Sequence, residues 1–241
     1  MNSIAARDSY DRPSIWEHCA LASGAMFVAL LLIAALVIPG PPGEQGSPAH
    51  NPAWLAAHQS AALIQVYVRG IAAVAQLIFI AGIVMVSRRA EGHISILALL
   101  AFGGAIIHTV MMLLSNAVTA AAAIGSGQGI DAGVVQGLGV LSDAILGIEP
   151  LAEALLFGAA AATLLRTHTV PRWIGWFGLI GVPLSLLGGA SYPGTPLDVV
   201  GFVALLFELV WFTCASIVLL LHARSRRSPQ RSQGAATEHA A

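Results

Sequence analysis

Two carboxylates four residues apart stand in the stretch "LGIEPLAEALLF", whose other residues are typical of a membrane helix. Glu149 and Glu153 share one helical face, because side chains at positions i and i+4 lie above one another. A charge inside a bilayer costs about 2.5–3.5 kcal/mol on insertion scales, so such residues are usually paired or functional. The spacing therefore predicts a carboxylate pair that faces the interior of a helical bundle.

Three other ionisable residues interrupt apolar segments at a similar depth. At about 1.5 Å per residue, all five side chains lie roughly 20–28 Å from the cytoplasmic ends of their helices. If the helices form a bundle, the five meet in one polar cluster that opens outward. The candidate cluster is Arg69, His108, Glu149, Glu153 and Glu208.

The residue types in this cluster leave several interpretations open. Arg69 could pair with one or two glutamates and fix the order of the helices. The carboxyl groups could instead carry protons or ions along a transport pathway. One histidine with three glutamates could also hold a divalent metal in an enzyme. In a fourth interpretation the residues never meet.

The sequence contains no HExxH, GxSxG or CxxC motif. We therefore predict no catalytic residue, no metal ligand and no cofactor, and favour a non-enzymatic protein. The favoured function is a structural, sensory or regulatory membrane component with an outward-facing polar pocket. The alternative is a small transporter or an ion or proton pathway that uses Arg69, Glu149, Glu153 and Glu208. The residues of the second span that follow Gln76 toward its predicted cytoplasmic end are apolar, which favours a binding site over a conducting pathway.

The composition places the chain in the lipid bilayer. Of its 241 residues 57% are hydrophobic and only 10% are charged, against about 25% charged in soluble domains. The net charge of −1 predicts no nucleic-acid partner. All eleven basic residues are arginine, which suggests a GC-rich bacterial gene. The sequence does not identify a protein partner or a small ligand.

Six segments approach the roughly 20 apolar residues that a membrane helix needs. We predict an all-α, polytopic transmembrane helical bundle with six spans at about 19–38, 61–86, 94–116, 148–165, 173–187 and 199–221. The membrane domain is then 19–221, between a cytoplasmic N-terminal segment, 1–18, and a disordered tail, 222–241. Ten of the eleven arginines fall on one side of this arrangement. By the positive-inside rule both termini are cytoplasmic, in the bacterial cytoplasmic (inner) membrane.

Two loops on the other side are predicted to contain helix. The stretch "NPAWLAAHQS", 51–60, reads as a short interfacial helix with Trp54 at headgroup depth. Residues 132–146 have helical spacing and form either an extra interfacial helix or an extension of the fourth span. In either case Pro150 predicts a bend. The motif "TPLD", 195–198, predicts the start of the last span.

The stretch "VPRWIGWFGLIG", Val170–Gly181, resembles the entry to the fifth span in six-span bacterial membrane proteins of unknown function. This Pro-Arg-Trp-x-Gly-Trp pattern covers about twelve residues and accompanies the same order of spans. Where those proteins carry an arginine–glutamate pair in the third span, this chain has "GGAIIHTVMML". The resemblance implies a six-span topology and no particular chemistry.

Overall fold

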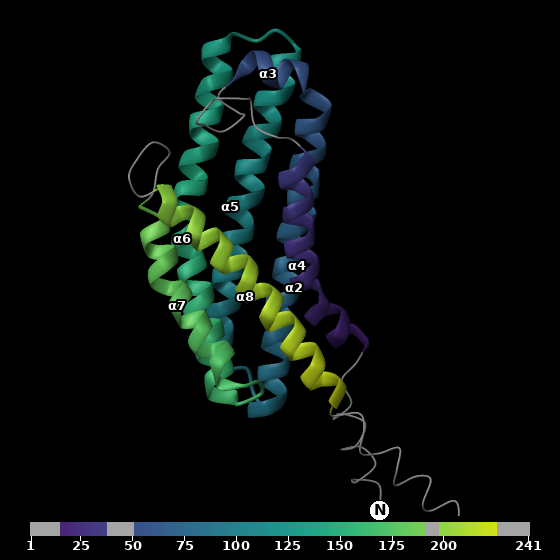
Figure 1. Ribbon diagram of the computed structural model, residues 1–241, viewed down its shortest axis with the longest axis vertical. Coiled ribbons are helices and arrows are strands. Elements are labelled where there is room, and N and C mark those ends of the chain that lie inside the picture. The colour runs from purple at the N-terminus through teal and green to yellow at the C-terminus, as the bar shows by residue number, and fades with distance from the viewer. Residues whose placement is uncertain (1–14, 38–50, 191–197, 226–241) are drawn as a thin grey trace, which may run out of the picture.

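The computed structural model of the protein describes residues 15–37, 51–190 and 198–225. These ranges contain seven α-helices and no strand (Figure 1). Five of the helices are long and apolar enough to cross a membrane, and a sixth, α7, is shorter. The prediction of an all-α fold is confirmed for the described residues, and the length and composition of these helices suit a multi-pass membrane protein. The helices are α2 (Ile15–Val37), α3 (Pro52–Ala57), α4 (Gln59–Glu91), α5 (Ile96–Gly127), α6 (Ala132–Thr167), α7 (Arg172–Gly188) and α8 (Asp198–Ser225).

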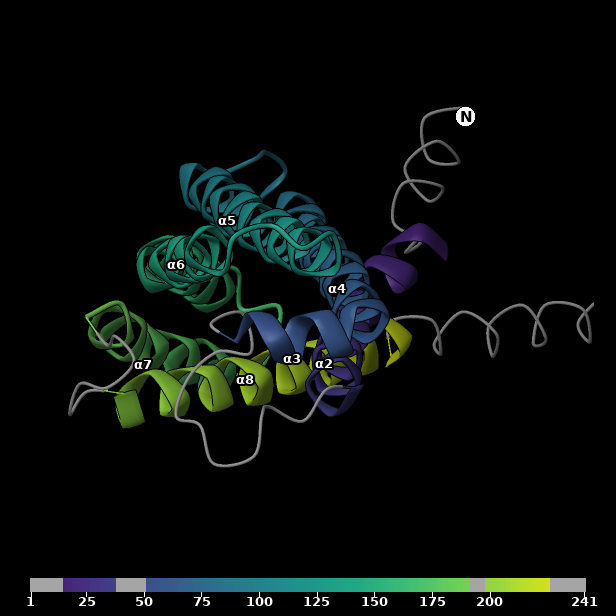
Figure 2. The ribbon, with the colours of Figure 1, turned by 90° about the horizontal axis from the view of Figure 1, so that it is seen from above.

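Six helices form a closed ring in chain order, and α3 lies across one end of it. Each of α2, α4, α5, α6, α7 and α8 packs against the next, and α8 returns to α2. Figure 2 shows this ring from the end that α3 covers. The ring arrangement means that side chains from helices distant in the sequence can meet along its axis.

The three central helices are longer than a membrane requires. α4, α5 and α6 have 33, 32 and 36 residues, roughly 50 Å each at 1.5 Å per residue. A hydrocarbon core is only about 30 Å thick. The excess extends beyond α7 and α8 at the end near α3 (Figure 1). There a second, small core forms from Leu55, Ala62, Ala122, Ala123 and Val135.

The short helix expected within 51–60 is present as α3. The side chain of Asn51 caps it by accepting a hydrogen bond from the Trp54 amide at 2.9 Å. Leu55 is buried in the second core, so α3 packs on the ends of α4 and α5 and closes this end of the ring.

Of the two alternatives for residues 132–146, the separate interfacial helix is wrong and the extension of the fourth span is confirmed, because these residues are the first part of α6. Asp131 caps this helix through the amides of Gly133 and Val134. The Ser142 hydroxyl lies 2.7 Å from the Ser115 hydroxyl of α5, which holds the extension against its neighbour. Helix continues through Pro150, so the loss of one backbone hydrogen bond does not break it when another helix packs alongside.

The other boundaries differ by several residues from the predicted spans. α2 begins at Ile15, inside the predicted N-terminal segment, and α8 continues to Ser225. The proposed cap at Thr195 lies outside the described residues.

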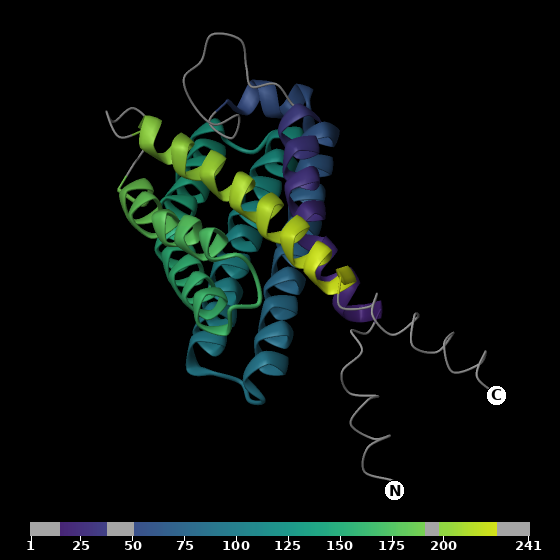
Figure 3. The same ribbon diagram turned by 60° about the horizontal axis from the view of Figure 1, so that its bottom comes forward.

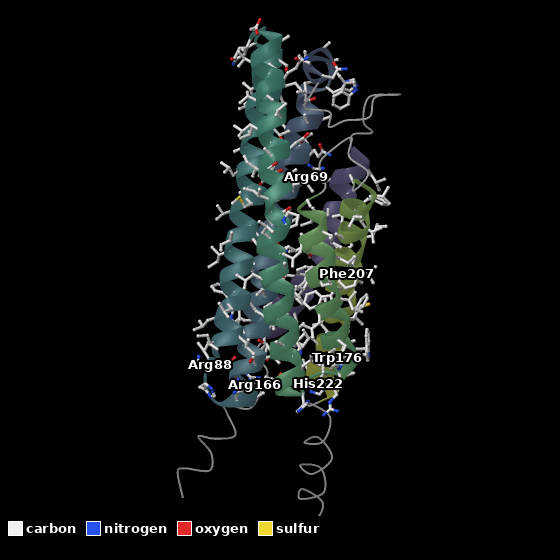
Figure 4. The ribbon with its side chains drawn as sticks, turned by 90° about the vertical axis from the view of Figure 1, so that its left-hand side faces the viewer. Arg69, Arg88, Arg166, Trp176, Phe207 and His222 are labelled. Atoms are coloured by element: carbon white, nitrogen blue, oxygen red, sulfur yellow. The ribbon has the colours of Figure 1, made fainter. Side chains whose placement is uncertain are left out.

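Arginines gather at the end of the ring opposite α3, which we call the arginine-rich end. α2 begins and α8 ends there (Figure 3), and Arg88 and Arg166 lie there in Figure 4. Two ion pairs join helices at this end. Arg89 Nη1 is 2.8 Å from Glu17 Oε2, and Arg166 Nε is 3.2 Å from Glu91 Oε1.

Candidate functional site

A buried histidine and two glutamates from three helices meet inside the ring. His108 Nε2 of α5 lies 3.1 Å from Glu149 Oε1 of α6 and 3.9 Å from Glu208 Oε1 of α8. His108 is 2% exposed and Glu208 is 6% exposed. Since α5 and α8 are not neighbours in the ring, the contact runs across its interior.

Two further helices complete this cluster. Gln76 of α4 donates a hydrogen bond from Nε2 to Glu208 Oε1 at 3.4 Å. Glu153, one turn after Glu149, interacts with the Ser185 hydroxyl of α7 and repels both other carboxylates electrostatically. We call Gln76, His108, Glu149, Glu153 and Glu208 the His108 cluster.

A glycine allows α5 and α6 to approach closely beside the cluster. Gly104 precedes His108 by one turn, and a Cβ built on it would lie 2.8 Å from the backbone nitrogen of Leu156. No side chain fits at that distance. The close approach brings the His108 imidazole within reach of Glu149.

Several polar atoms of the cluster lack a hydrogen-bond partner among the described residues. They are both ring nitrogens of His108, Gln76 Oε1 and Glu153 Oε1. The His108–Glu149 contact is therefore short without being an aligned hydrogen bond. Buried polar atoms are normally satisfied, and most of the groups here are acceptors. A ligand for this site would thus be rich in hydrogen-bond donors.

Arg69 does not contact the carboxylates, although the sequence predicted that it would meet Glu149 and Glu153 in one polar cluster. No carboxylate of the described residues lies within 4.0 Å of its guanidinium. Arg69 precedes Gln76 by seven residues, so its Cα lies roughly 10 Å further from the arginine-rich end. In Figure 4 it lies well above the labelled residues of that end. At roughly 28 Å from Arg88 it is near the edge of the hydrocarbon core, where headgroups and water are close.

No group of three or more metal-ligating side chains in the described residues has the geometry to hold a metal ion. The His108 cluster nevertheless places two carboxyl groups within 3.9 Å of one imidazole, with the third, Glu153, one helical turn after Glu149. Such a set can accept hydrogen bonds from, and neutralise, a cation that is not a coordinated metal. The described residues therefore offer no set of ligands for the metal-assisted enzyme.

A layer of aromatic side chains lies directly beyond the cluster, toward the arginine-rich end. Phe79, Phe157 and Trp211 follow Gln76, Glu153 and Glu208 by three or four residues, about one helical turn. The Phe157 and Trp211 rings are 5.0 Å apart, and Trp211 and Phe212 are 5.2 Å apart. All are fully buried. This aromatic layer, completed by Phe27, separates the cluster from the arginine-rich end.

Gln76 of the His108 cluster and Ser185, which contacts Glu153, were not among the candidates from the sequence. Gln76 shares a helical face with Arg69, but an uncharged amide gives no strong signal. Ser185 lies two residues after Pro183 in a glycine-rich segment, and a single serine there is unremarkable. Both were recognisable only after the ring had placed α4 and α7 beside the glutamates.

The comparisons with known proteins add no relative. Neither a protein-family model, nor a curated protein, nor a solved structure matches the chain.

Proposed function

We propose that this protein is a sensory or regulatory component of the bacterial inner membrane that binds a small ammonium-type cation at the His108 cluster. The observation that carries the proposal is the convergence of Glu149 and Glu208 on His108 within 3.9 Å, without a guanidinium within 4.0 Å of them in the described residues. A protonated amine supplies positive charge and several N–H donors in one small group.

The charge balance of the cluster supports a cationic ligand. Ionised carboxylates removed from water are costly unless a positive charge and hydrogen bonds compensate them. Arg69, the one arginine expected to do so, lies roughly 10 Å away along α4. The unpaired acceptors Gln76 Oε1 and Glu153 Oε1 lie in the same group. A donor-rich cation would satisfy both requirements at once.

The proposed topology has six spans with both termini in the cytoplasm. α7 has 17 residues, roughly 26 Å, which is close to the thickness of a hydrocarbon core. It starts at the arginine-rich end and packs beside α6 and α8, stopping short of the end that α3 covers (Figure 1). Arg88, Arg89, Arg166 and Arg172 at one end support a cytoplasmic position for that end. The His108 cluster then lies on the outer side of the aromatic layer.

The aromatic layer favours binding over transport. A conducting pathway needs polar groups or water on both sides of its binding site, whereas fully buried rings follow this one. Trp211 is also held in place, because its Nε1 donates a hydrogen bond to the Ile174 carbonyl at 3.2 Å. A bound cation in this arrangement would change the packing of the ring without crossing it.

The proposal is tested by thermal unfolding of the purified full-length protein in detergent with ammonium or methylammonium chloride. Binding to the folded state raises the melting temperature by an amount that grows with the logarithm of ligand concentration. Sodium chloride at equal ionic strength controls for screening. We expect stabilisation by the ammonium salts only, and its loss in Glu208→Gln.

Asp131→Asn is the matched control, since it removes an exposed carboxylate and asparagine also caps helices. It should keep the full response. Equal responses to sodium and ammonium, or an unchanged response in Glu208→Gln, would overturn the proposal. Accumulation of methylammonium in proteoliposomes, abolished by Glu208→Gln, would instead establish the transporter alternative.

A further inference from the structure

A groove between α4 and α5, whose lining shares no residue with the His108 cluster, has a volume of about 450 Å³. Its walls are apolar side chains, several of them substantially exposed, including Ile71 at 40% and Val74 at 47%. Gly70 forms part of its floor. In a membrane protein this surface faces lipid rather than water.

One polar side chain breaks the apolar lining. Asn116 of α5 lines the groove and is 7% exposed. Its Nδ2 has no hydrogen-bond partner among the described residues. A buried amide donor without an acceptor is unfavourable by about 1–3 kcal/mol. Because Nδ2 is itself buried, the amide would have to turn toward the groove, where an acceptor supplied by the occupant would satisfy it.

The depth of the polar group identifies that acceptor. Asn116 is 20 residues from Ile96, the start of α5 at the arginine-rich end, so it lies roughly 30 Å from that end. Tyr67 in the same groove is 21 residues from Arg88, roughly 31 Å. Tyrosine is enriched at membrane interfaces, and Tyr67 is 70% exposed. The polar end of the groove is thus at the edge of the hydrocarbon core, where lipid chains are joined to glycerol through esters.

We infer that this groove binds a diacyl phospholipid from the leaflet opposite the arginine-rich end. One acyl chain lies along the apolar walls from Tyr67 toward Val74. Its ester carbonyl accepts a hydrogen bond from the Asn116 side-chain amide. A transmembrane helix of a second copy would fill the apolar walls equally well, but its backbone carbonyls are already bonded within the helix. The unpaired amide therefore favours the lipid.

Gly70 provides a graded test of occupancy. A Cβ at position 70 would lie 3.6 Å from Leu113 Cδ2, an ordinary contact, so Gly70→Ala should leave the groove usable. Gly70→Leu fills it, and Ala117→Phe fills it from α5 at an exposed position. Gly103→Leu is the control, because position 103 lies outside the groove and a Cβ there would meet no atom within 4 Å.

The experiment is native mass spectrometry of the full-length protein in detergent, titrated with a diester phosphatidylglycerol. We expect one tightly bound lipid in the wild type, Gly70→Ala and Gly103→Leu, and its loss in Gly70→Leu and Ala117→Phe. An ether-linked analogue lacks the carbonyl acceptor and should bind about five-fold more weakly, as expected for one hydrogen bond. Asn116→Leu should abolish that preference.

Lipid binding that persists in both Gly70→Leu and Ala117→Phe would overturn the inference. So would equal binding of ester and ether lipids by the wild type. A dimer that these two variants convert to monomer, without any change in bound lipid, would assign the groove to a second copy. None of these results depends on the His108 cluster, so the ammonium response measures a separate property.

Discussion

Gly104 of α5 lies so close to α6 that a Cβ on it would be 2.8 Å from the Leu156 nitrogen and 3.1 Å from its Cα. Both atoms are backbone, so the contact cannot be relieved by turning a side chain. The two helices are the most extensively packed neighbours in the ring, and the His108 cluster begins one turn beyond this contact. This relationship sets the position of the imidazole.

Gly104→Ala should therefore destabilise the protein although alanine favours helix. Overpacking a tight site costs about 1–3 kcal/mol, which exceeds the gain of roughly 1 kcal/mol in helix propensity. The adjacent Gly103→Ala is a matched control, because nothing lies within 4 Å of its Cβ. Unfolding in mixed micelles should show a loss for position 104 and no loss for position 103. Equal effects at both positions would contradict the close approach.

The contact between His108 and Glu149 should appear as an energetic coupling. At 3.1 Å, substitutions of the two residues are expected to be non-additive by about 0.5–3 kcal/mol. A double-mutant cycle with His108→Gln and Glu149→Gln measures this difference in the free energy of unfolding. The same cycle between His108→Gln and the distant Asp131→Asn should give additive values. Additivity in both cycles would mean that the two side chains do not interact.

The architecture was largely predictable because it depends on composition and on hydrophobic runs. Long apolar segments, with arginines only at alternate connections, correspond to α2, α4, α5, α6 and α8. The residues of α6 predicted helix at 132–146 but left open whether it extends the fourth span. Ser142 and Val135 are buried there because α5 and α3 extend beside them, and neighbouring helices cannot be assigned from residues 132–146 alone.

The candidate site was predictable in part for the same reason. Ionisable residues stand out in apolar runs, so the sequence alone could group four of them by their depth along the predicted spans: His108, Glu149, Glu153 and Glu208. Their partners could not be assigned, since depth along a helix does not fix which helices are neighbours. Arg69 was grouped with them because its opposite charge suggested a pair, yet its position two turns beyond Gln76 keeps it apart.

Arg69 and Glu153 should consequently behave as independent residues. Sites without a shared contact add within about 0.5 kcal/mol, and no carboxylate lies within 4.0 Å of Arg69 in the described residues. The changes in unfolding free energy of Arg69→Gln and Glu153→Gln should therefore sum to that of the double variant. A double variant more stable than either single variant would show instead that the arginine and the glutamate form a structural ion pair.

The ion pair between Glu17 and Arg89 should contribute more to stability than the one between Glu91 and Arg166. The Glu17 side chain is 4% exposed and its Oε2 is 2.8 Å from Arg89 Nη1, whereas the Arg166 side chain is 58% exposed. An ion pair between exposed charges is worth about 0–1 kcal/mol, whereas removing one partner of a buried pair costs more, up to about 3–5 kcal/mol. Unfolding of Arg89→Gln and Arg166→Gln in low and high salt compares the two pairs. Arg89→Gln should be the less stable variant, and salt should reduce the smaller loss in Arg166→Gln proportionally more, because exposed charges are screened better. An equal loss in the two variants would mean that burial of Glu17 does not strengthen its pair and that the contact between α2 and α4 at this end rests on apolar packing alone.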